Sequence, residues 1–267
     1  MDLYTLLGFL AATLIGISLG LIGGGGSILT VPILVYLMGI SPVLATAYSL
    51  FVVGSTSLVG SFSYMRRGSI SYRTALVFAL PSFAAVFLTR RYIVHALPEI
   101  LFTFQGITLS RDVAIMVFFA IIMVAAAYSM IKNGKKLVPE KDDRSLNYPL
   151  IAVQGLFEGA VTGIVGAGGG FLIIPALVLL AKLPMKKAVG TSLLIISAKS
   201  LLGFTGDLST QTIDWKFLLI FTGLSIIGIF VGSMLSKKIN DSSLKKGFGW
   251  FVLIMGIYIL IKEIFGI

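Results

Sequence analysis

Long runs of apolar residues, separated by short polar stretches, dominate the sequence. Examples are the runs from Asp2 to Gly23, Ala75 to Thr89, Val113 to Ile131, Phe217 to Leu235 and Gly249 to Ile261. Several of them approach the roughly 20 residues that an α-helix needs to cross a bilayer. The pattern predicts an all-α, polytopic bundle of transmembrane helices.

Composition supports a membrane location. The 267 residues are 57% hydrophobic and 12% charged, whereas a soluble domain is about 25% charged. Asp2 is the first charge before a long apolar run, so that run is expected to be retained and not cleaved as a signal. The chain has no cysteine, which excludes disulfides and thiolate chemistry, and no cofactor or metal is predicted. The net charge of +10 comes from Lys and Arg between apolar runs, so we expect a lipid bilayer and no nucleic acid as partner.

The chain repeats itself at an interval of 143 residues. A block from Gly16 to Gly26 is followed by Pro32, and a similar block from Gly159 to Gly169 is followed by Pro175. Glycine and proline positions coincide as well as apolar ones, which indicates a duplication. Residues 132–148 between the halves are polar, charged and contain proline, as is typical of a linker. We therefore predict a first membrane repeat (residues 1–131), a cytoplasmic linker (132–148) and a second membrane repeat (149–267).

The distribution of Lys and Arg predicts the topology. Each half is expected to hold an apolar segment, a glycine break, a short apolar segment and three further spans. If the glycine-broken stretch crosses once, each side of the membrane receives ten basic residues. If it returns to its own side, fifteen fall on one side and five, including Arg90 and Arg91, on the other. The positive-inside rule favours the second arrangement, with both termini outside the cell membrane.

The halves then enter the membrane from opposite sides, as two inverted-topology repeats that each start with a glycine-broken helical hairpin. The stretch from Arg90 to Asp112 between the spans is predicted to be an amphipathic interfacial segment.

The contiguous glycines are the first candidate site. They open short apolar segments, so their N–H groups would lie at helix N-termini with no side chain to block an anion. Irregular backbone at membrane depth needs protein or water around it, and inverted repeats bring two such breaks together. The leading glycines Gly16, Gly20, Gly159 and Gly163 instead fit close helix packing. The candidate substrate-binding residues on the breaks are Gly23, Gly24, Gly25, Gly26, Ser27, Gly166, Gly168, Gly169 and Gly170.

Three ionisable residues fall within or at the end of apolar runs. Lys199 lies in mid-span, where an ammonium costs at least about 2.5 kcal/mol, so it should face a cavity or a partner. It is either a counter-charge for the transported anion or half of an ion pair with Glu158 or Asp207. Either carboxylate is a candidate for proton coupling, although Asp207 could instead lie at the membrane interface.

Hydroxyl groups on the spans after the hairpins complete the candidate set. Such groups can line an oxyanion site, but in membrane helices they commonly bond their own backbone or a neighbouring helix. The predicted substrate-binding pairs at matching positions are Tyr48 with Thr191 and Ser49 with Ser192. The motifs of zinc proteases, serine esterases and nucleotide-binding loops are absent, so no catalytic residue is predicted and the chain is not expected to be an enzyme.

The duplicated block of the form G-x-x-x-G-x-x-G-x-G-G resembles the TauE/SafE family. In each half it is followed by an apolar run and by the stretches from Ala45 to Leu50 and from Ala188 to Leu193. The resemblance covers nearly the whole chain. It implies an inner-membrane secondary transporter that exports sulfite or organosulfonates such as sulfoacetate, with the substrate near the hairpins. Thr56 stands where the second half has Lys199, so such a site would be chemically lopsided.

Three alternatives remain open at this point. The transporter could import sulfur oxyanions, it could carry a small carboxylate, or the chain could be a non-transporting membrane assembly subunit. Sequence alone sets neither the direction of transport nor the head group of the anion.

Overall fold

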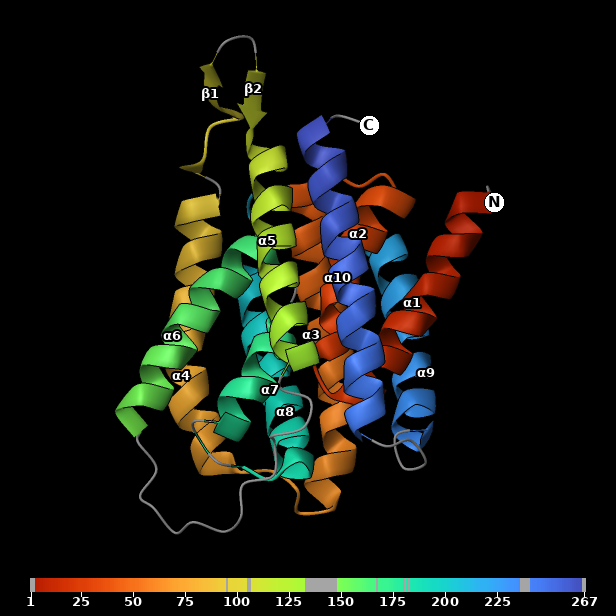
Figure 1. Ribbon diagram of the computed structural model, residues 1–267, viewed down its shortest axis with the longest axis vertical. Helices are drawn as coiled ribbons and strands as arrows, with labels where there is room; N and C mark the ends of the chain where they lie inside the picture. Colours follow the sequence, from red (N-terminus) through yellow and green to blue (C-terminus); the bar gives the residue numbers. More distant parts are fainter. Residues whose placement is uncertain are drawn as a thin grey trace.

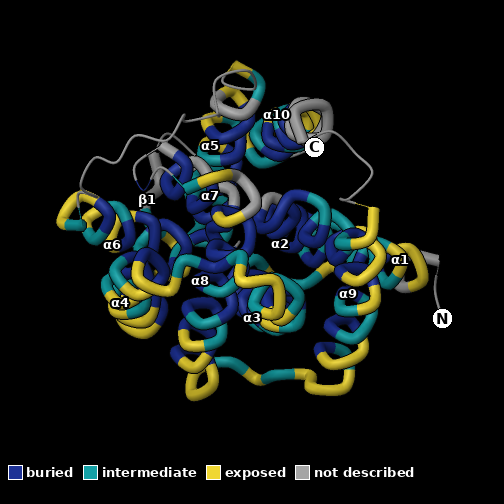
Figure 2. The backbone as a smooth tube through the Cα atoms, turned by 90° about the horizontal axis from the view of Figure 1, so that it is seen from below, coloured by how far each residue is buried: buried dark blue, intermediate teal, exposed yellow. Residues whose placement is uncertain are grey.

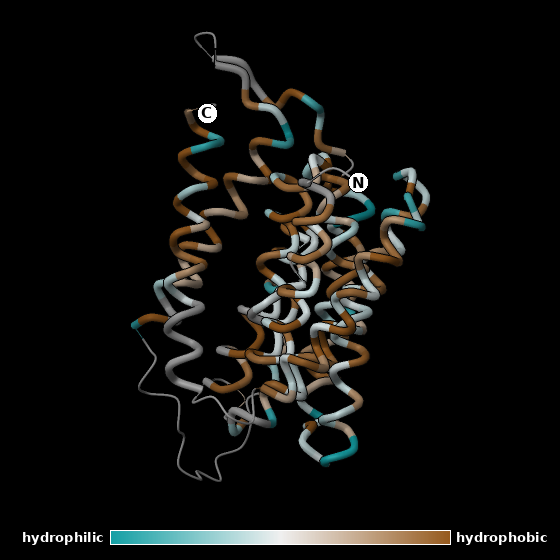
Figure 3. Tube along the Cα trace, turned by 90° about the vertical axis from the view of Figure 1, so that its right-hand side faces the viewer, coloured by the Kyte–Doolittle hydropathy of each residue, from teal (hydrophilic) through white to brown (hydrophobic). Residues whose placement is uncertain are grey.

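The computed structural model describes residues 3–94, 96–104, 107–132, 148–166, 168–179, 181, 183–235 and 241–265. These residues form ten α-helices and one short β-hairpin, so the predicted all-α bundle is confirmed (Figure 1). Figure 3 shows apolar residues along most of the length of the helices. Many large apolar side chains, such as Leu10, Phe157 and Phe230, are more than half exposed, as expected of a surface that faces lipid.

The first half begins with α1 (Leu3–Ile22) and continues into a broken segment. This segment consists of the 3₁₀ turn η1 (Gly25–Leu29), the short α2 (Thr30–Pro32) and the π-helix η2 (Ile33–Leu37). Three further helices follow: α3 (Pro42–Arg66), α4 (Tyr72–Leu88), which continues into the π-helix η3 (Thr89–Val94), and α5 (Arg111–Lys132). The antiparallel strands β1 (Ile100–Phe104) and β2 (Ile107–Ser110) lie between η3 and α5, where an interfacial segment was predicted.

The second half has the same order of elements. It contains α6 (Tyr148–Val165), α7 (Gly170–Leu179), α8 (Met185–Thr205), α9 (Trp215–Leu235) and α10 (Asp241–Phe265). Boundaries coincide at the sequence offset: α1 and α6 end 143 residues apart, as α3 and α8 begin 143 residues apart. Residues 133–147, most of the predicted linker, lie outside the described residues.

Six helices among the described residues are long and apolar enough to cross a membrane. They are α3, α4 with η3, α5, α6, α8 and α9, and shorter apolar helices cover Leu6–Ile22 and Gly26–Leu37. The chain is therefore a multi-pass membrane protein.

The centre of the bundle is formed by α3 and α8, which pack against each other. Of their membrane spans 72% is buried, compared with 39–44% for the other four. Around them α1 packs on α9, α4 on α6 and α5 on α10. Figure 2 shows the exposed residues on the outer faces of α1, α4, α6 and α9. The glycine-broken segments are thus enclosed between the two central helices and the outer ones.

The halves contact each other through matching residues. The backbone N–H of Ser71 donates to Thr191 Oγ1 at 2.9 Å, and that of Asp214 donates to Tyr48 Oη at 2.8 Å. Both members of the second pair stand 143 positions from their counterparts in the first. Reciprocal contacts of this kind are what a two-fold relationship produces.

Both ends of the chain lie at one end of the bundle. In Figure 1, α1 begins and α10 ends at the end that carries β1 and β2, which we call the terminal end. The connection between α3 and α4 lies at the opposite end, which we call the loop end.

Candidate functional site

The two glycine breaks meet at the centre of the bundle. A Cβ atom built on Gly24 would lie 2.6 Å from the Cα atom of Gly170 and 2.8 Å from Ile196 Cδ1. A Cβ on Gly170 would in turn collide with the backbone of Gly24. Both positions therefore require glycine, and the breaks that the sequence predicts to approach each other are in contact.

Left-handed backbone ends the helix before each break. Gly23 has φ 79° and its counterpart Gly166 has φ 70°, a region that side chains disfavour. Gly168 and Gly169 have φ values of 64° and 63°, and α7 begins at the next residue. The first N–H groups of a helix have no acceptor within it, so the start of α7 carries partial positive charge at the meeting point of the breaks.

Each break packs against the central helix of the other half. A Cβ on Gly23 would collide with Val189 of α8, and one on Gly166 would collide with Thr46 of α3. Gly25 belongs to η1, and Gly26 packs against the backbone of α1 at Leu19. The leading glycines pack closely against neighbouring helices, as predicted. A Cβ atom would collide with the backbone of the neighbour at Gly16, Gly20 and Gly159, and with the Thr89 side chain at Gly163.

Lys199 forms a fully buried ion pair with Glu158. Its ammonium also donates to Thr162 Oγ1 at 3.1 Å. The Glu158 carboxylate accepts two more hydrogen bonds, from Thr162 Oγ1 at 2.7 Å and from Ser82 Oγ at 3.1 Å. Of the two partners that the sequence allowed for Lys199, the structure selects Glu158.

This ion pair lies directly against the second glycine break. A Cβ atom on Gly169 would lie 2.7 Å from Lys199 Nζ and would collide with the carboxylate of Glu158 and the hydroxyl of Thr162. The ammonium therefore lies directly beside the backbone of the second break.

The first half has a different composition at the matching positions. Ile15 and Thr56 stand where the second half has Glu158 and Lys199. The hydroxyl of Thr56 is buried and has no hydrogen-bond partner among the described residues. The charged residues beside the second glycine break, Glu158 and Lys199, therefore have uncharged counterparts in the first half, as the sequence predicts.

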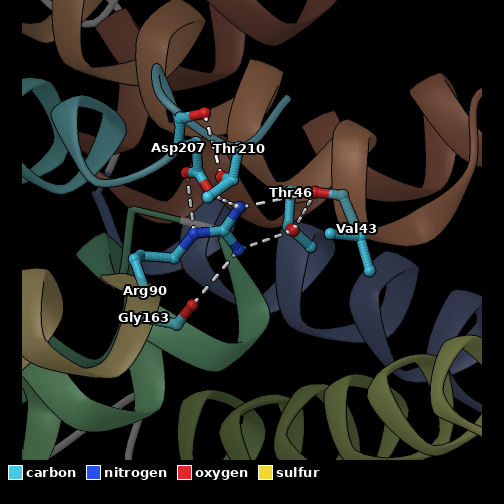
Figure 4. A network of polar contacts seen from close by, with 6 residues as sticks. All are labelled: Val43, Thr46, Arg90, Gly163, Asp207 and Thr210. Carbon is cyan, nitrogen blue, oxygen red and sulfur yellow. Dashed lines mark hydrogen bonds and ion pairs between the residues drawn. The ribbon is translucent and has the colours of Figure 1, made fainter. Parts of the chain in front are cut away.

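Asp207 pairs with Arg90, which was predicted to begin an interfacial segment between two spans. Arg90 Nε and Nη2 donate to the two oxygens of Asp207 at 2.8 and 2.7 Å (Figure 4). Arg90 Nη1 donates to Thr46 Oγ1 at 2.8 Å and to the carbonyl of Gly163 at 3.3 Å, and Nη2 also donates to the carbonyl of Val43 at 3.4 Å. Both charged side chains are completely buried, so Asp207 forms an internal ion pair.

The burial of Arg90 has a cause that helix length could have revealed. The helix that starts at Tyr72 runs without interruption to Val94, a span of 23 residues. A membrane-crossing helix needs about 20 residues, so counting from Tyr72 places Arg90 inside the span and not after it.

The predicted hydroxyl pairs divide into two groups. Tyr48 and Thr191 accept hydrogen bonds from N–H groups just before α9 and α4, so their oxygens support helix starts. Ser192 donates to the carbonyl of Val189 at 2.8 Å, and Ser27 donates to that of Gly24 at 2.7 Å. These four are engaged within the protein.

Several buried hydroxyls on the first hairpin and the central helices have no hydrogen-bond partner among the described residues. Buried polar atoms without a partner are few in folded proteins, and they mark places where water or a ligand can bind. Ser200 Oγ lies 3.5 Å from the Cβ position of Gly168, and Ser57 is its counterpart at the 143-residue offset. The side chains of this kind among the described residues of the hairpin and central helices are Thr30, Ser49, Thr56, Ser57 and Ser200.

Comparison with known proteins places this architecture in a family. Residues 8–259 match the family model described as sulfite exporter TauE/SafE. A "probable membrane transporter protein" of Xylella fastidiosa is 28% identical over 253 residues, which cover 92% of this chain and 91% of the relative. The "probable membrane transporter protein YunE" of Bacillus subtilis is 24% identical over 92% of this chain and 93% of its own length. A similarly described protein of Haemophilus influenzae is 25% identical over 97% of this chain and 99% of its own. The chain is thus a membrane transporter and not an enzyme, and it belongs to the TauE/SafE family.

Proposed function

We propose that this transporter moves small anions, sulfite or organosulfonates such as sulfoacetate, outward across the cell membrane. The observation that carries the proposal is the contact of Gly24 with Gly170 beside the ammonium of Lys199. Backbone N–H groups at helix starts bind oxyanions, and glycines leave them accessible. The unengaged hydroxyl of Ser200, 3.5 Å from the Cβ position of Gly168, adds a donor beside the second break. The choice of a sulfur oxyanion is supported by the name of the matching family model.

The two halves form inverted-topology repeats in this proposal, residues 1–131 and 149–267. Support comes from the reciprocal contacts between halves and from the opposite directions of α1 and α6 in Figure 1. The terminal end faces outward, and the linker is cytoplasmic. With Arg90 buried, four of the five basic residues that the sequence assigns to the outer side remain, against fifteen assigned to the cytoplasmic side, so the positive-inside bias becomes stronger.

Glu158 couples anion binding to a proton in this mechanism. An unpaired ammonium is costly in a buried site, so Lys199 needs an anionic partner at every stage. When Glu158 is protonated, its negative charge disappears and the substrate anion at the Gly169 break takes its place beside Lys199. Proton and anion then move together, and the flux runs outward when the internal anion concentration is high.

Counterflow in proteoliposomes tests this function. We expect exchange of sulfite or sulfoacetate by the wild-type protein, and loss of exchange in Lys199→Ala, Gly25→Leu and Gly168→Leu. Gly223→Leu is the matched control, because nothing lies within 4 Å of a Cβ at Gly223. Unchanged exchange in all three variants would show that the anion does not bind at the glycine breaks or at Lys199.

The same assay separates the alternative functions. Exchange of a carboxylate without any sulfur oxyanion would change the substrate class. Uptake into right-side-out vesicles but not into everted vesicles would reverse the direction to import. Absence of exchange for every anion would favour an assembly subunit.

A further inference from the structure

The second buried ion pair ties four segments of the bundle together. Arg90 lies on η3, and its guanidinium binds Asp207 just beyond α8, Thr46 near the start of α3 and Gly163 near the end of α6 (Figure 4). These segments come from both halves of the chain. Any separation of them at the terminal end must break bonds to this guanidinium.

The Arg90 network also reaches the second glycine break. Thr46 accepts a hydrogen bond from Arg90 Nη1, and the same residue is the one that a Cβ on Gly166 would strike. The side chain of Arg90 therefore lies beside the start of the second break.

The matching place at the other end of the bundle is built differently. The residues 143 positions from Arg90 and Asp207 are Ser233 and Tyr64, which cannot form an ion pair. There a cavity of about 710 Å³ opens between α3 and α9, and Ser233 and the exposed Arg66 are among its lining residues. One position thus carries a buried salt bridge, while the matching position at the other end of the bundle borders a cavity at the protein surface.

We propose that Arg90 is a second binding site for the transported oxyanion. In the structure the Asp207 carboxylate occupies this site, and the resulting salt bridge keeps the terminal end closed. The inference rests on the proposed transport function. A carboxylate and a sulfonate both present two oxygens to the fork of a guanidinium. An arriving oxyanion can therefore take the two N–H bonds that Asp207 now accepts, and Arg90 stays paired throughout, as a buried charge requires.

Asp207 has a short route to water once it is displaced. The next residues, Leu208 and Ser209, are exposed, and the turn that contains them begins where α8 ends. Movement of this turn would release α8 from η3 and α3, and the terminal end would open.

Thiol labelling tests the inference without relying on flux. The chain has no cysteine, so a single Leu50→Cys substitution on α3, buried one turn inward from Thr46, reports whether the terminal end opens. Sulfoacetate is the probe, because sulfite itself reacts with thiol reagents. We expect sulfoacetate to accelerate labelling by an impermeant reagent from the terminal side in a saturable way. Arg90→Lys keeps the charge without the fork and should lose this response.

Asp207→Asn should open the terminal end without substrate. Labelling of the thiol introduced at position 50 is expected to rise about tenfold or more, the factor for losing a hydrogen bond between charged groups. Asp214→Asn at the start of α9 is the matched control and should leave labelling within about twofold, because an amide oxygen can still cap the helix. Equal labelling in wild type, Asp207→Asn and Arg90→Lys, with or without sulfoacetate, would show a fixed structural tie and overturn the inference.

A double variant guards against misfolding of the single ones. Arg90→Met with Asp207→Leu replaces the pair by apolar side chains, a change that buried ion pairs often tolerate. It should fold and show no response to sulfoacetate, and a preserved response would contradict the proposal. Wild-type counterflow without any labelling response would defeat this inference alone, whereas absence of counterflow would defeat the proposed function.

Discussion

Gly24 and Gly170 are in direct contact although 146 residues separate them in the sequence. Each belongs to a glycine break, and each leaves no room for a Cβ atom on the other. The contact fixes where the two repeats meet, and it places the start of α7 beside a buried ammonium.

Alanine at either of these glycines should separate the breaks. The added methyl group overpacks the contact, which typically costs about 1–3 kcal/mol. We expect Gly24→Ala and Gly170→Ala to lower thermal stability in detergent and to reduce counterflow. Gly223→Ala, which adds a methyl group into open space, should match the wild type. Wild-type behaviour of Gly24→Ala would contradict the contact.

Loss of Glu158 should destabilise the fold strongly. Glu158→Gln leaves Lys199 buried without a counter-charge, and breaking a buried pair costs about 3–5 kcal/mol. The first repeat suggests a repair, because it has Ile15 and Thr56 at the matching positions. The double variant Glu158→Ile with Lys199→Thr should recover most of the stability in denaturant unfolding. A single variant as stable as the wild type would show that the pair contributes little.

Glu158→Gln, which removes the carboxylate and keeps Lys199, should uncouple transport from protons. An acid-inside gradient is expected to accelerate anion efflux by the wild-type protein, because Glu158 must be protonated before the anion binds. The variant has no carboxylate at this position and should show no acceleration in proteoliposomes. An equal effect of the gradient on both proteins would exclude Glu158 as the coupling group.

The hydroxyl groups of Tyr48 and Thr191 are expected to act in folding. Each accepts one backbone hydrogen bond before a helix start, and such a bond contributes about 1 kcal/mol. Tyr48→Phe and Thr191→Val should each lower the unfolding free energy by that amount. Unchanged stability together with weaker anion binding would instead indicate that both hydroxyl groups bind the substrate.

Single cysteines test the proposed orientation in cells. Arg91 is exposed on η3 at the terminal end, and Arg67 is exposed directly after α3 at the loop end, so each can be replaced by cysteine. We expect an impermeant reagent to label position 91 in intact cells and position 67 after permeabilisation. The reverse pattern would invert the topology.

The order of the helices and the place of the breaks were predictable because both depend on local sequence. Apolar runs set the helices, and glycine positions set the breaks at Gly23 and Gly166. The β-hairpin was missed, although Ile100, Phe102 and Phe104 alternate with other residues as strand residues do. This alternation covers only five residues, and the surrounding apolar runs all favoured helices.

Ion-pair partners were harder to predict because they depend on helix packing. Lys199 had two carboxylates within reach in the sequence, and the packing of helices α6 and α8 around the Gly169 break brings Glu158 to it. Asp207 pairs with Arg90. Arg90 was assigned to the region between two spans because the sequence pattern did not show that α4 continues through η3.

The position of a bound oxyanion tests the central claim most directly. Selenite is a close analogue of sulfite, and its selenium can be located by anomalous scattering in crystals of the protein. The account predicts selenium where the glycine breaks meet, with oxygens within about 3.2 Å of backbone nitrogens of the second break and of Lys199 Nζ. Selenium found only in the cavity near Arg66, or nowhere along the breaks, would contradict it.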